Sequence, residues 1–250
     1  MTPKTRIYLP GTYATGENLE LSEEAFGHVV RVLRLIQGDA ISVFNGDGFD
    51  YLARLTEVAK KRARIEIVDK SEVANESPLD LHLGQVISRG DRMDFTLQKS
   101  VELGVRSITP LFSERCGVKL SGERLQKRVA QWQKIVISAC EQSGRAYVPK
   151  VNDAIELDTF LAQSTQALKL NLHPRAEHSI MTLPMADLAE QHQSKVRLLI
   201  GPEGGLSTEE IDKANTLGYT EVLLGPRVLR TETAALTAIT ALQCRFGDLQ

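Results

Sequence analysis

The stretch from residue 79 to residue 247 alternates short apolar segments with longer segments in which apolar residues recur at helical spacing. The apolar segments predict strands at 79–88, 105–112, 167–173, 195–201 and 221–225. The longer segments predict helices at 91–104, 121–144, 207–218 and 231–247. Parallel strands need long crossover connections, and these are usually helices. The alternation therefore predicts an α/β domain with a parallel sheet that is covered by helices on both faces.

The first 70 or so residues follow another pattern, in which apolar and polar side chains alternate over short stretches typical of strands. The sequence NGDG at 45–48 predicts the turn of a β-hairpin. Residues 22–34 predict a helix that begins after Ser22. Its buried face is expected to carry Ala25, Val29 and Val32 or Leu33. We expect a small β-barrel with one inserted helix at 1–72, a polar linker within 71–80, and the α/β domain at 73–250.

Charge and cysteine content exclude several classes of protein. The chain has 250 residues and a net charge of −2, whereas a protein that binds nucleic acid by charge alone is usually more basic. A local basic patch is nevertheless enough to bind phosphates.

The three cysteines are far apart and the five histidines form no HxxxH or mixed His/Cys set, so we expect no disulfide framework and no metal. Neither a signal-peptide h-region nor a membrane-length apolar run is evident, which favours a soluble cytoplasmic protein.

The sequence GPEGG at 201–205 leaves a predicted strand, and Ser207 with Glu210 then forms a capping box that starts the next helix. Ligands of parallel α/β sheets bind at this end of the strands. The loop lacks the GxxxxGK[ST] and GxGxxG spacings, and Glu203 would repel a phosphate, so a phosphate cradle is excluded. A carboxylate suits a cation or hydroxyl groups better. Taken alone, the loop also fits a plain turn in which glycine supplies positive φ.

Two further loops leave strands in the same way, at 170–177 and at 223–236. Three such exits from neighbouring strands would lie side by side at one edge of the sheet. Together they would enclose a flat, partly apolar ligand, with Leu224, Val228 and Leu229 as apolar walls.

Four segments in this order and spacing carry a resemblance over nearly the whole chain: LFSERCGVKL (111–120), ACEQSGR (139–145), LLIGPEGGLSTEEI (198–211) and LLGPRVLRTETAALTAITALQ (223–243). Together with RIYLP (6–10) and HVVRVLR (28–34), they closely resemble the RsmE family, the 16S rRNA uridine-N3 methyltransferases of the SPOUT superfamily. The resemblance implies a PUA-like β-barrel followed by a SPOUT domain with a C-terminal trefoil knot. It also implies a homodimer that uses S-adenosyl-L-methionine and acts on 16S rRNA, as part of the 30S subunit.

The same resemblance implies which loops hold the cofactor, at 170–174, 200–205 and 224–230. The expected cofactor-binding residues are Leu172, His173, Ile200, Gly201, Pro202, Gly204, Gly205, Leu224, Gly225, Pro226, Val228, Leu229 and Thr233.

The chemistry of uridine N3 suggests catalytic candidates, because this nitrogen carries a proton about as acidic as a lysine ammonium or a tyrosine phenol. Arg230 would stabilise the anion that remains after deprotonation; the alternative is an arginine that caps the helix or pairs with Glu232. Glu232 or Glu203 would act as the base if burial raises its pKa. Glu203 would alternatively bind ribose hydroxyls, and water with anion stabilisation alone is a further alternative. N3 lies on the pairing edge of the base, so an unpaired or extruded uridine is expected.

Basic residues outside the predicted core are candidates for RNA contacts. Those expected to bind RNA are Arg6, Arg31, Arg34, Arg89, Lys99, Arg115, Lys119 and Arg145, with Arg92 nearby. The basic run at 60–64 fits a solvated edge strand at least as well. Two other functions remain open at this point: methylation of another RNA position, such as a ribose 2′-oxygen, and RNA binding without catalysis.

Overall fold

A computed structural model describes residues 5–183 and 191–249. The chain divides into two compact units, one made of residues 1–76 and 140–148 and the other of residues 77–139 and 149–250. The sequence-based boundary at residue 72 placed the segment 140–148 in the second domain, whereas it belongs to the first unit. No helix among the described residues is long and apolar enough to cross a membrane.

The N-terminal unit contains a five-stranded sheet within the described residues, in the order β1-β3-β4-β5-β2. The strands are β1 (Arg6–Tyr8), β2 (Asn18–Glu20), β3 (Ala40–Phe44), β4 (Phe49–Val58) and β5 (Ala63–Glu72). β3 and β4 are antiparallel and joined at residues 45–48, which confirms the predicted hairpin. Gly46 and Gly48 have φ of 98° and 92°, the left-handed region that the NGDG sequence is suited to supply.

The helical segment of this unit differs from the prediction after its first turn. Ser22 accepts a hydrogen bond from the backbone N of Ala25 and begins α1 (Glu23–Phe26), as expected. The segment then continues as a π-helix, η1 (Gly27–Val32). Ala25 and Val29 are buried, but Val32 is 67% exposed, so the predicted apolar face is wrong at its end. The wider π-turn rotates Val32 and Leu33 away from the stripe that α-helical spacing would give them.

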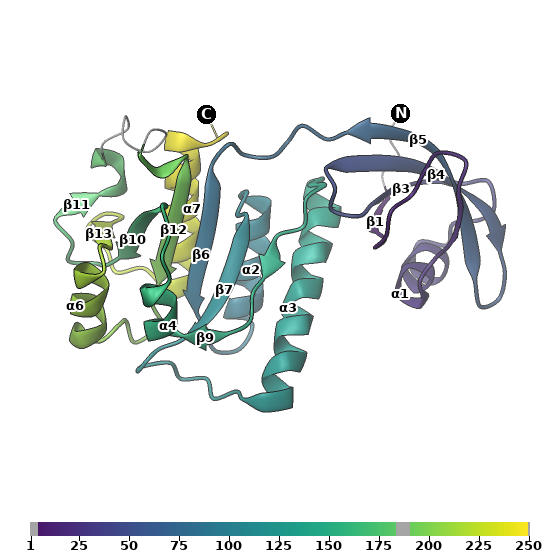
Figure 1. Cartoon of the computed structure of the whole chain (residues 1–250). Coiled ribbons are helices and arrows are strands. Elements are labelled where there is room, and N and C mark those ends of the chain that lie inside the picture. Colours follow the sequence, from purple (N-terminus) through teal and green to yellow (C-terminus); the bar gives the residue numbers. More distant parts are fainter. Residues whose placement is uncertain (1–4, 184–190, 250) are drawn as a thin grey trace. The chain divides into compact units, whose positions relative to one another are not determined.

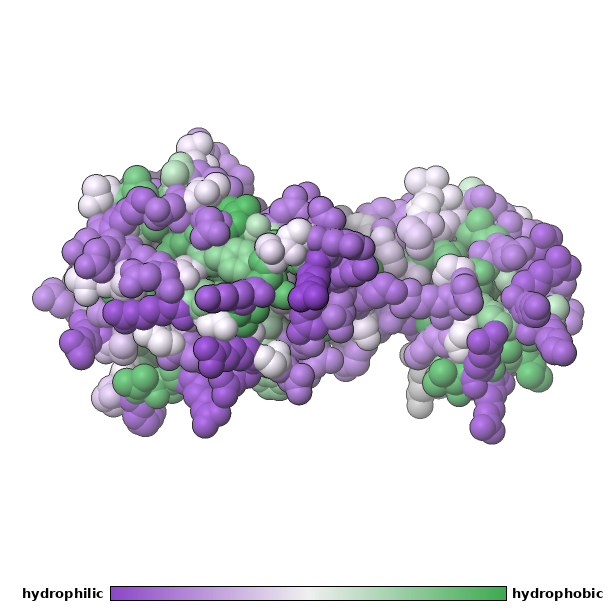
Figure 2. All heavy atoms as spheres, turned by 90° about the horizontal axis from the view of Figure 1, so that it is seen from below, coloured by the Kyte–Doolittle hydropathy of each residue, from purple (hydrophilic) through white to green (hydrophobic). Residues whose placement is uncertain are grey.

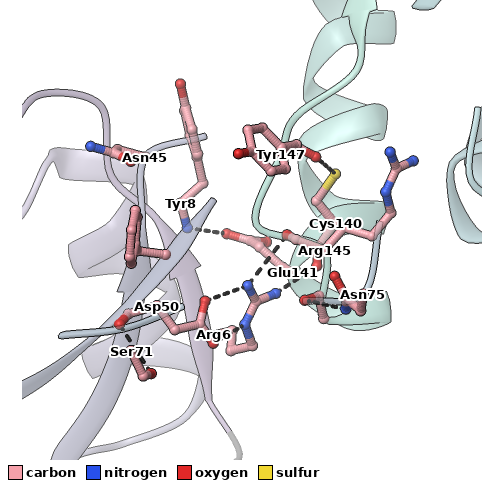
Figure 3. Close-up of polar contacts among 12 residues, drawn as sticks. Arg6, Tyr8, Asn45, Asp50, Ser71, Asn75, Cys140, Glu141, Arg145 and Tyr147 are labelled. Atoms are coloured by element: carbon pink, nitrogen blue, oxygen red, sulfur yellow. Dashed lines mark hydrogen bonds and ion pairs between the residues drawn. The ribbon is translucent and has the colours of Figure 1, made fainter. Parts of the chain in front are cut away.

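A polar network holds residues 140–148 within the N-terminal unit (Figure 3). Arg6 Nη2 lies 2.6 Å from Asp50 Oδ1, and Arg6 Nη1 donates to the carbonyl oxygen of Cys140 at 2.7 Å. The backbone N of Tyr8 donates to Glu141 Oε1 at 2.9 Å. Strand β1 is therefore bonded to a segment that lies more than a hundred residues away in the sequence.

The larger unit is built on an eight-stranded sheet within the described residues, and every strand pair in it is parallel, as predicted (Figure 1). The order is β11-β13-β10-β12-β6-β7-β8, with β9 also paired to β7. The five predicted strands are β6 (Asp80–Val86), β7 (Ser107–Phe112), β10 (Leu168–Leu172), β12 (Lys195–Ile200) and β13 (Thr220–Leu223). Three very short strands were not expected: β8 (Lys150–Val151), β9 (Ile155–Glu156) and β11 (His178–Ser179).

Four predicted helices are present as α2 (Arg92–Glu102), α3 (Gly122–Ser143), α6 (Thr208–Thr216) and α7 (Thr231–Phe246). The predictions missed α4 (Leu157–Ala162) and the 3₁₀ turn η2 (Ile180–Thr182). α2 and α7 pack together on one side of the sheet, where α7 contacts β12. α4 packs on the sheet with Phe160, whose ring lies where a Cβ on Gly84 of β6 would be. In α3, Trp132 and Val136 are buried.

Candidate functional site

Three loops leave β10, β12 and β13 at the carboxyl ends of these adjacent strands. The loop after β10 is tied to β13, because the backbone N of His173 donates to the carbonyl oxygen of Val222 at 2.9 Å. The loop after β12 closes on itself through Gly205 N and Pro202 O, also 2.9 Å apart. The loop after β13 turns at Gly225, whose φ of 116° suits glycine, and runs into α7.

A hydrogen-bond chain joins two of these loops to the centre of the sheet. Thr231 Oγ1 donates to the carbonyl oxygen of Gly201 at 2.7 Å. Gln85 Nε2 of β6 in turn donates to Thr231 Oγ1 at 3.1 Å. Both side chains are buried, so the start of α7 and the end of β12 are fixed relative to each other.

The three loops and the start of α7 enclose a cavity of about 440 Å³. Its walls include apolar side chains from each loop, and its rim carries charged ones. In Figure 1 the arrowhead of β6 marks the carboxyl-end edge of the sheet in the larger unit. Figure 2 looks onto this edge, on its left side, and shows an apolar patch surrounded by hydrophilic surface. A volume of this size and a mostly apolar lining are typical of small-molecule sites.

The rim holds two carboxylates close to one guanidinium. Glu203 Oε1 accepts hydrogen bonds from the backbone N of Arg89 and from Arg92 Nη1, both at 3.0 Å. Arg92 Nε lies 3.9 Å from Glu232 Oε1. Burial raises the pKa of Glu203, but the hydrogen bonds from the Arg89 backbone and the Arg92 side chain outweigh it, so the pKa lies below the ordinary value.

Several polar atoms of the lining residues have no hydrogen-bond partner among the described residues. Both amide atoms of Asn171 are buried and unpartnered, and so is Glu232 Oε2. His173 Nδ1 lies 2.8 Å from Glu221 Oε2, without the alignment of a hydrogen bond. A buried polar group without a partner costs about 1–3 kcal/mol. These atoms are therefore candidates for hydrogen bonds to a ligand.

The comparisons with known proteins agree with this location. A family model of an RNA methyltransferase domain matches residues 75–243, which include all three loops and α2. A model of an RNA methyltransferase PUA domain matches residues 21–68. The chain belongs to the RNA methyltransferase family.

Individual relatives indicate which kind of RNA methyltransferase the chain resembles. The chain is 39% identical over 245 residues to ribosomal RNA small subunit methyltransferase E of Buchnera aphidicola subsp. Schizaphis graminum, covering 98% of this chain and 97% of that protein. It is 30% identical over 227 residues to the protein of the same name from Bacillus subtilis, covering 89% and 88%. The resemblance to the RsmE family that the sequence motifs indicated is thereby confirmed.

Two solved structures of methyltransferases have the same fold. A putative methyltransferase from Legionella pneumophila, in complex with bound SAM, superposes with a TM-score of 0.94 at 46% identity, covering 99% of this chain and 100% of that one. Ribosomal RNA small subunit methyltransferase E from Neisseria gonorrhoeae, bound to S-adenosyl methionine, superposes with a TM-score of 0.90 at 42% identity, covering 98% and 99%. The fold is therefore a SPOUT-type methyltransferase fold with a PUA domain.

The expected ligand-binding residues of the family divide into two groups. Those that line the cavity are Leu172, His173, Ile200, Gly201, Pro202, Gly205, Leu224, Gly225, Val228 and Leu229, together with the three catalytic candidates Glu203, Arg230 and Glu232. Gly204, Pro226 and Thr233 do not line it. Gly204 faces the side chain of Arg115, and Pro226 and Thr233 are exposed. Arg230 is the N-cap residue of α7, as the alternative interpretation expected, although its side chain makes no capping hydrogen bond. It makes no ion pair with Glu232 among the described residues.

Sequence reasoning did not single out the other lining residues: Arg92, Asn171, Pro174, Leu206, Ile211, Arg227, Thr231 and Ala234. Three of these, Asn171, Pro174 and Arg227, nevertheless lie within the loops that the family resemblance assigned to the cofactor. One signal for Asn171 was present, because it is a lone amide in the apolar strand segment LKLNL. Arg92 had no such signal. It lies more than a hundred residues before Glu203 in the sequence, and only the packing of α2 brings the two together.

Some of the residues expected to bind RNA have partners within the protein, and others are exposed without such partners being their main feature in the fold. Arg6 and Arg145 are largely buried in the N-terminal unit, where Arg145 Nη2 lies 2.6 Å from Glu76 Oε2. Lys99 pairs with Glu102, and Arg115 donates to the carbonyl oxygens of Gly204 and Leu206. These four side chains therefore hold the protein's own structure. Arg115 is nevertheless exposed, as are the four others, Arg31, Arg34, Arg89 and Lys119.

Arg34 has an unusual backbone. Its φ is 56°, a region that non-glycine residues seldom adopt and that is enriched at functional sites. It lies two residues after the end of the π-helix, another feature found often at functional sites.

In the described part of the chain, no group of three or more His, Cys, Asp or Glu side chains is arranged to hold a metal ion.

Proposed function

We propose that this protein transfers the methyl group of S-adenosyl-L-methionine to N3 of a uridine in 16S ribosomal RNA. The observation that carries the proposal is the cavity enclosed by the loops after β10, β12 and β13, which lies within the matched methyltransferase domain. Relatives that cover nearly the whole chain are named small-subunit rRNA methyltransferases, and two solved structures of the same fold contain the methyl donor.

The cavity fits the proposed cofactor on its own features. Its volume lies in the usual range for sites of this kind, roughly 300–1,000 Å³. Its apolar walls suit a heterocyclic base, and the unpartnered amide of Asn171 offers one donor side and one acceptor. The ten lining residues named above from the three loops would hold it. S-adenosyl-L-methionine supplies an electrophilic methyl group, and the protein's part is to bind, align and deprotonate.

Arg230 is the proposed anion-stabilising residue. Its side chain lines the cavity, is exposed, and makes no ion pair within the described residues. A free guanidinium at the rim can donate to O2 or O4 of a uracil as N3 loses its proton. Donors to a developing oxyanion contribute about 3 kcal/mol in other enzymes.

Of the two carboxylates, Glu232 is the better candidate for the base. Glu203 accepts two hydrogen bonds through Oε1, and its pKa is lowered, which makes it a weaker base. Glu232 has a buried oxygen, Oε2, that accepts no hydrogen bond from the described residues. That oxygen can accept the N3 proton. Water, with Arg230 stabilising the anion, is the alternative acceptor.

RNA binding is assigned to exposed basic residues, Arg31 and Arg34 in the PUA domain and Arg89 and Lys119 in the catalytic domain. As the family resemblance implies, we also expect a C-terminal trefoil knot, a homodimer, an assembled 30S subunit as substrate and a cytoplasmic location.

The test is methyl transfer to 30S subunits that lack the modification, followed by identification of the modified nucleoside. We expect 3-methyluridine. A ribose-methylated nucleoside would instead support the alternative of a 2′-O-methyltransferase. RNA binding without saturable binding of the methyl donor would identify a binding protein rather than an enzyme.

A further inference from the structure

Arg92 is the first residue of α2 and the one lining residue of the cavity that α2 contributes within the described part of the chain. Its guanidinium faces two carboxylates, one in the loop after β12 and one in the first turn of α7. Nη1 lies 3.0 Å from Glu203 Oε1, in the loop after β12, and Nε lies 3.9 Å from Glu232 Oε1, at the start of α7. One cation therefore bridges the same two segments that the Thr231–Gly201 hydrogen bond joins, but at their charged side chains.

The two carboxylates are held to different degrees. Glu203 is fixed by Arg92 and by the backbone N of Arg89 at 3.0 Å. Glu232 is 16% exposed, with one oxygen toward Arg92 and the other buried without a partner among the described residues. The orientation of the free oxygen thus depends on how the first oxygen is held, and Arg92 is the charged group that holds it.

Electrostatic repulsion between the two carboxylates explains why a single arginine lies between Glu203 and Glu232. Two carboxylates at one rim repel each other, and a shared cation offsets that repulsion. The other charged or titratable side chains that line the cavity are His173, Arg227 and Arg230. His173 is next to Glu221, and neither Arg227 nor Arg230 forms an ion pair with Glu203 or Glu232. Within the described residues, only Arg92 is within ion-pair distance of the two carboxylates.

We infer that Arg92 is a positioning residue for the proposed methyl transfer, on which this inference rests: it holds Glu203 and Glu232 side by side and leaves one oxygen of Glu232 free to take the N3 proton. Arg92 does not itself contact the reacting atoms. The assignment differs from the sequence-based one, in which Arg92 was among the surface arginines near RNA.

The inference predicts a pH effect of definite sign. With Arg92 removed, the two carboxylates lose their shared cation, and one of them takes up a proton at higher pH than before. The acid limb of the pH–rate profile then moves to higher pH. A lysine at this position restores the charge but not the two-pronged geometry of a guanidinium, so its effect is smaller.

The experiment compares wild type, Arg92→Gln and Arg92→Lys in single-turnover methyl transfer to unmodified 30S subunits across pH, with dissociation constants for S-adenosylhomocysteine and for the RNA. We expect Arg92→Gln to lower the rate at neutral pH by at least about 10-fold, with an acid limb moved upward. Both dissociation constants should stay within about 3-fold of wild type, and Arg92→Lys should recover much of the rate.

Arg128→Gln is the matched control. Arg128 also pairs with a carboxylate on α2, Asp94, at 2.8 Å, but does not line the cavity. Its pH–rate profile should match that of wild type. If Arg92→Gln weakens RNA binding in proportion to the rate and its acid limb does not move, Arg92 is an RNA contact and the inference is wrong.

A second measurement separates this inference from the proposed function. Glutamate side chains labelled with ¹³C can be titrated by NMR without turnover, with Glu203→Gln and Glu232→Gln used for assignment. In Arg92→Gln, at least one of the two signals should titrate at higher pH than in wild type. If wild type transfers no methyl group but this shift occurs, the proposed function fails and the bridging role stands; without the shift, the bridging role is wrong in either case.

Discussion

Thr231 Oγ1 donates a 2.7 Å hydrogen bond to the carbonyl oxygen of Gly201, which ties the first residue of α7 to the end of β12. Thr231 is 6% exposed and also accepts from Gln85 Nε2. Thr231→Val keeps the shape but removes both bonds. We expect a loss of about 1–3 kcal/mol in the free energy of unfolding. We also expect weaker binding of S-adenosylhomocysteine, measured by calorimetry. Thr231→Ser retains the hydroxyl and should stay close to wild type; equal losses in both variants would contradict the argument.

Arg230→Ala should separate binding from chemistry. The free guanidinium at the rim is proposed to act only when negative charge develops on the uracil. Its loss should therefore lower the rate of methyl transfer about 100-fold or more, with the affinity for S-adenosylhomocysteine nearly unchanged. Single-turnover rates and calorimetry give the two numbers. A matching loss in both would move Arg230 to a cofactor-binding role.

Glu203 gives a pH dependence of stability that can be worked out from its contacts. Its pKa in the folded protein lies below the ordinary value, so its contribution to stability is present above the unfolded pKa and is lost as pH falls through the folded pKa. The side chain is 29% exposed, which limits the effect to about 0.5 kcal/mol. Urea denaturation gives the free energy of unfolding of wild type and of Glu203→Gln. The difference in favour of wild type should be larger by this amount near pH 7 than near pH 3. A constant difference across that range would show that the carboxylate's charge does not matter.

The sequence predicted most of the regular structure because that structure rests on local patterns. The capping box of Ser207 and Glu210 is present as expected, with bonds of 3.3 and 2.8 Å. The π-helix was missed because the spacing of Ala25 and Val29 fits either kind of helix until the next turn. The attachment of Cys140 and Glu141 to β1 was missed because their bonds join segments with no local signal.

In the candidate site, too, residues with a local sequence signal were predicted and residues placed by distant packing were not. Loops with a sequence signature, such as GPEGG, were located in advance. Arg92 was not, because its place at the rim depends on how α2 packs in the domain. Likewise, the burial of Arg6 and Arg145 follows from partners distant in the sequence, Asp50 and Glu76, so composition alone could only suggest surface arginines.

Asn171→Leu tests whether the buried amide belongs to the cofactor site. The substitution keeps a similar volume and removes two polar atoms that have no partner among the described residues. If a bound ligand satisfies them, the variant should bind S-adenosylhomocysteine at least about 10-fold more weakly while the ligand-free protein is as stable as wild type or more so. Ser100→Ala, which removes another buried and unpartnered polar atom outside the cavity, should leave this affinity unchanged. An unaltered affinity in Asn171→Leu would mean that the amide serves no ligand.

Arg6 and Arg31 lie in the same unit, and their roles should separate cleanly. Arg6 has a side chain only 10% exposed and is paired with Asp50, so Arg6→Gln leaves a buried carboxylate without its cation and should cost about 3 kcal/mol of stability. Arg31 is exposed, and its guanidinium carbon lies 5.3 Å from the centre of the Phe26 ring, so Arg31→Gln should change stability by less than about 0.5 kcal/mol. Arg31→Gln should instead weaken binding to 16S rRNA and reduce its salt dependence. Arg54→Gln, another exposed arginine of this unit, controls for the loss of one charge. Thermal unfolding and RNA titrations at two salt concentrations would measure both properties; weakened RNA binding by Arg6→Gln at unchanged stability would return Arg6 to the RNA-binding surface.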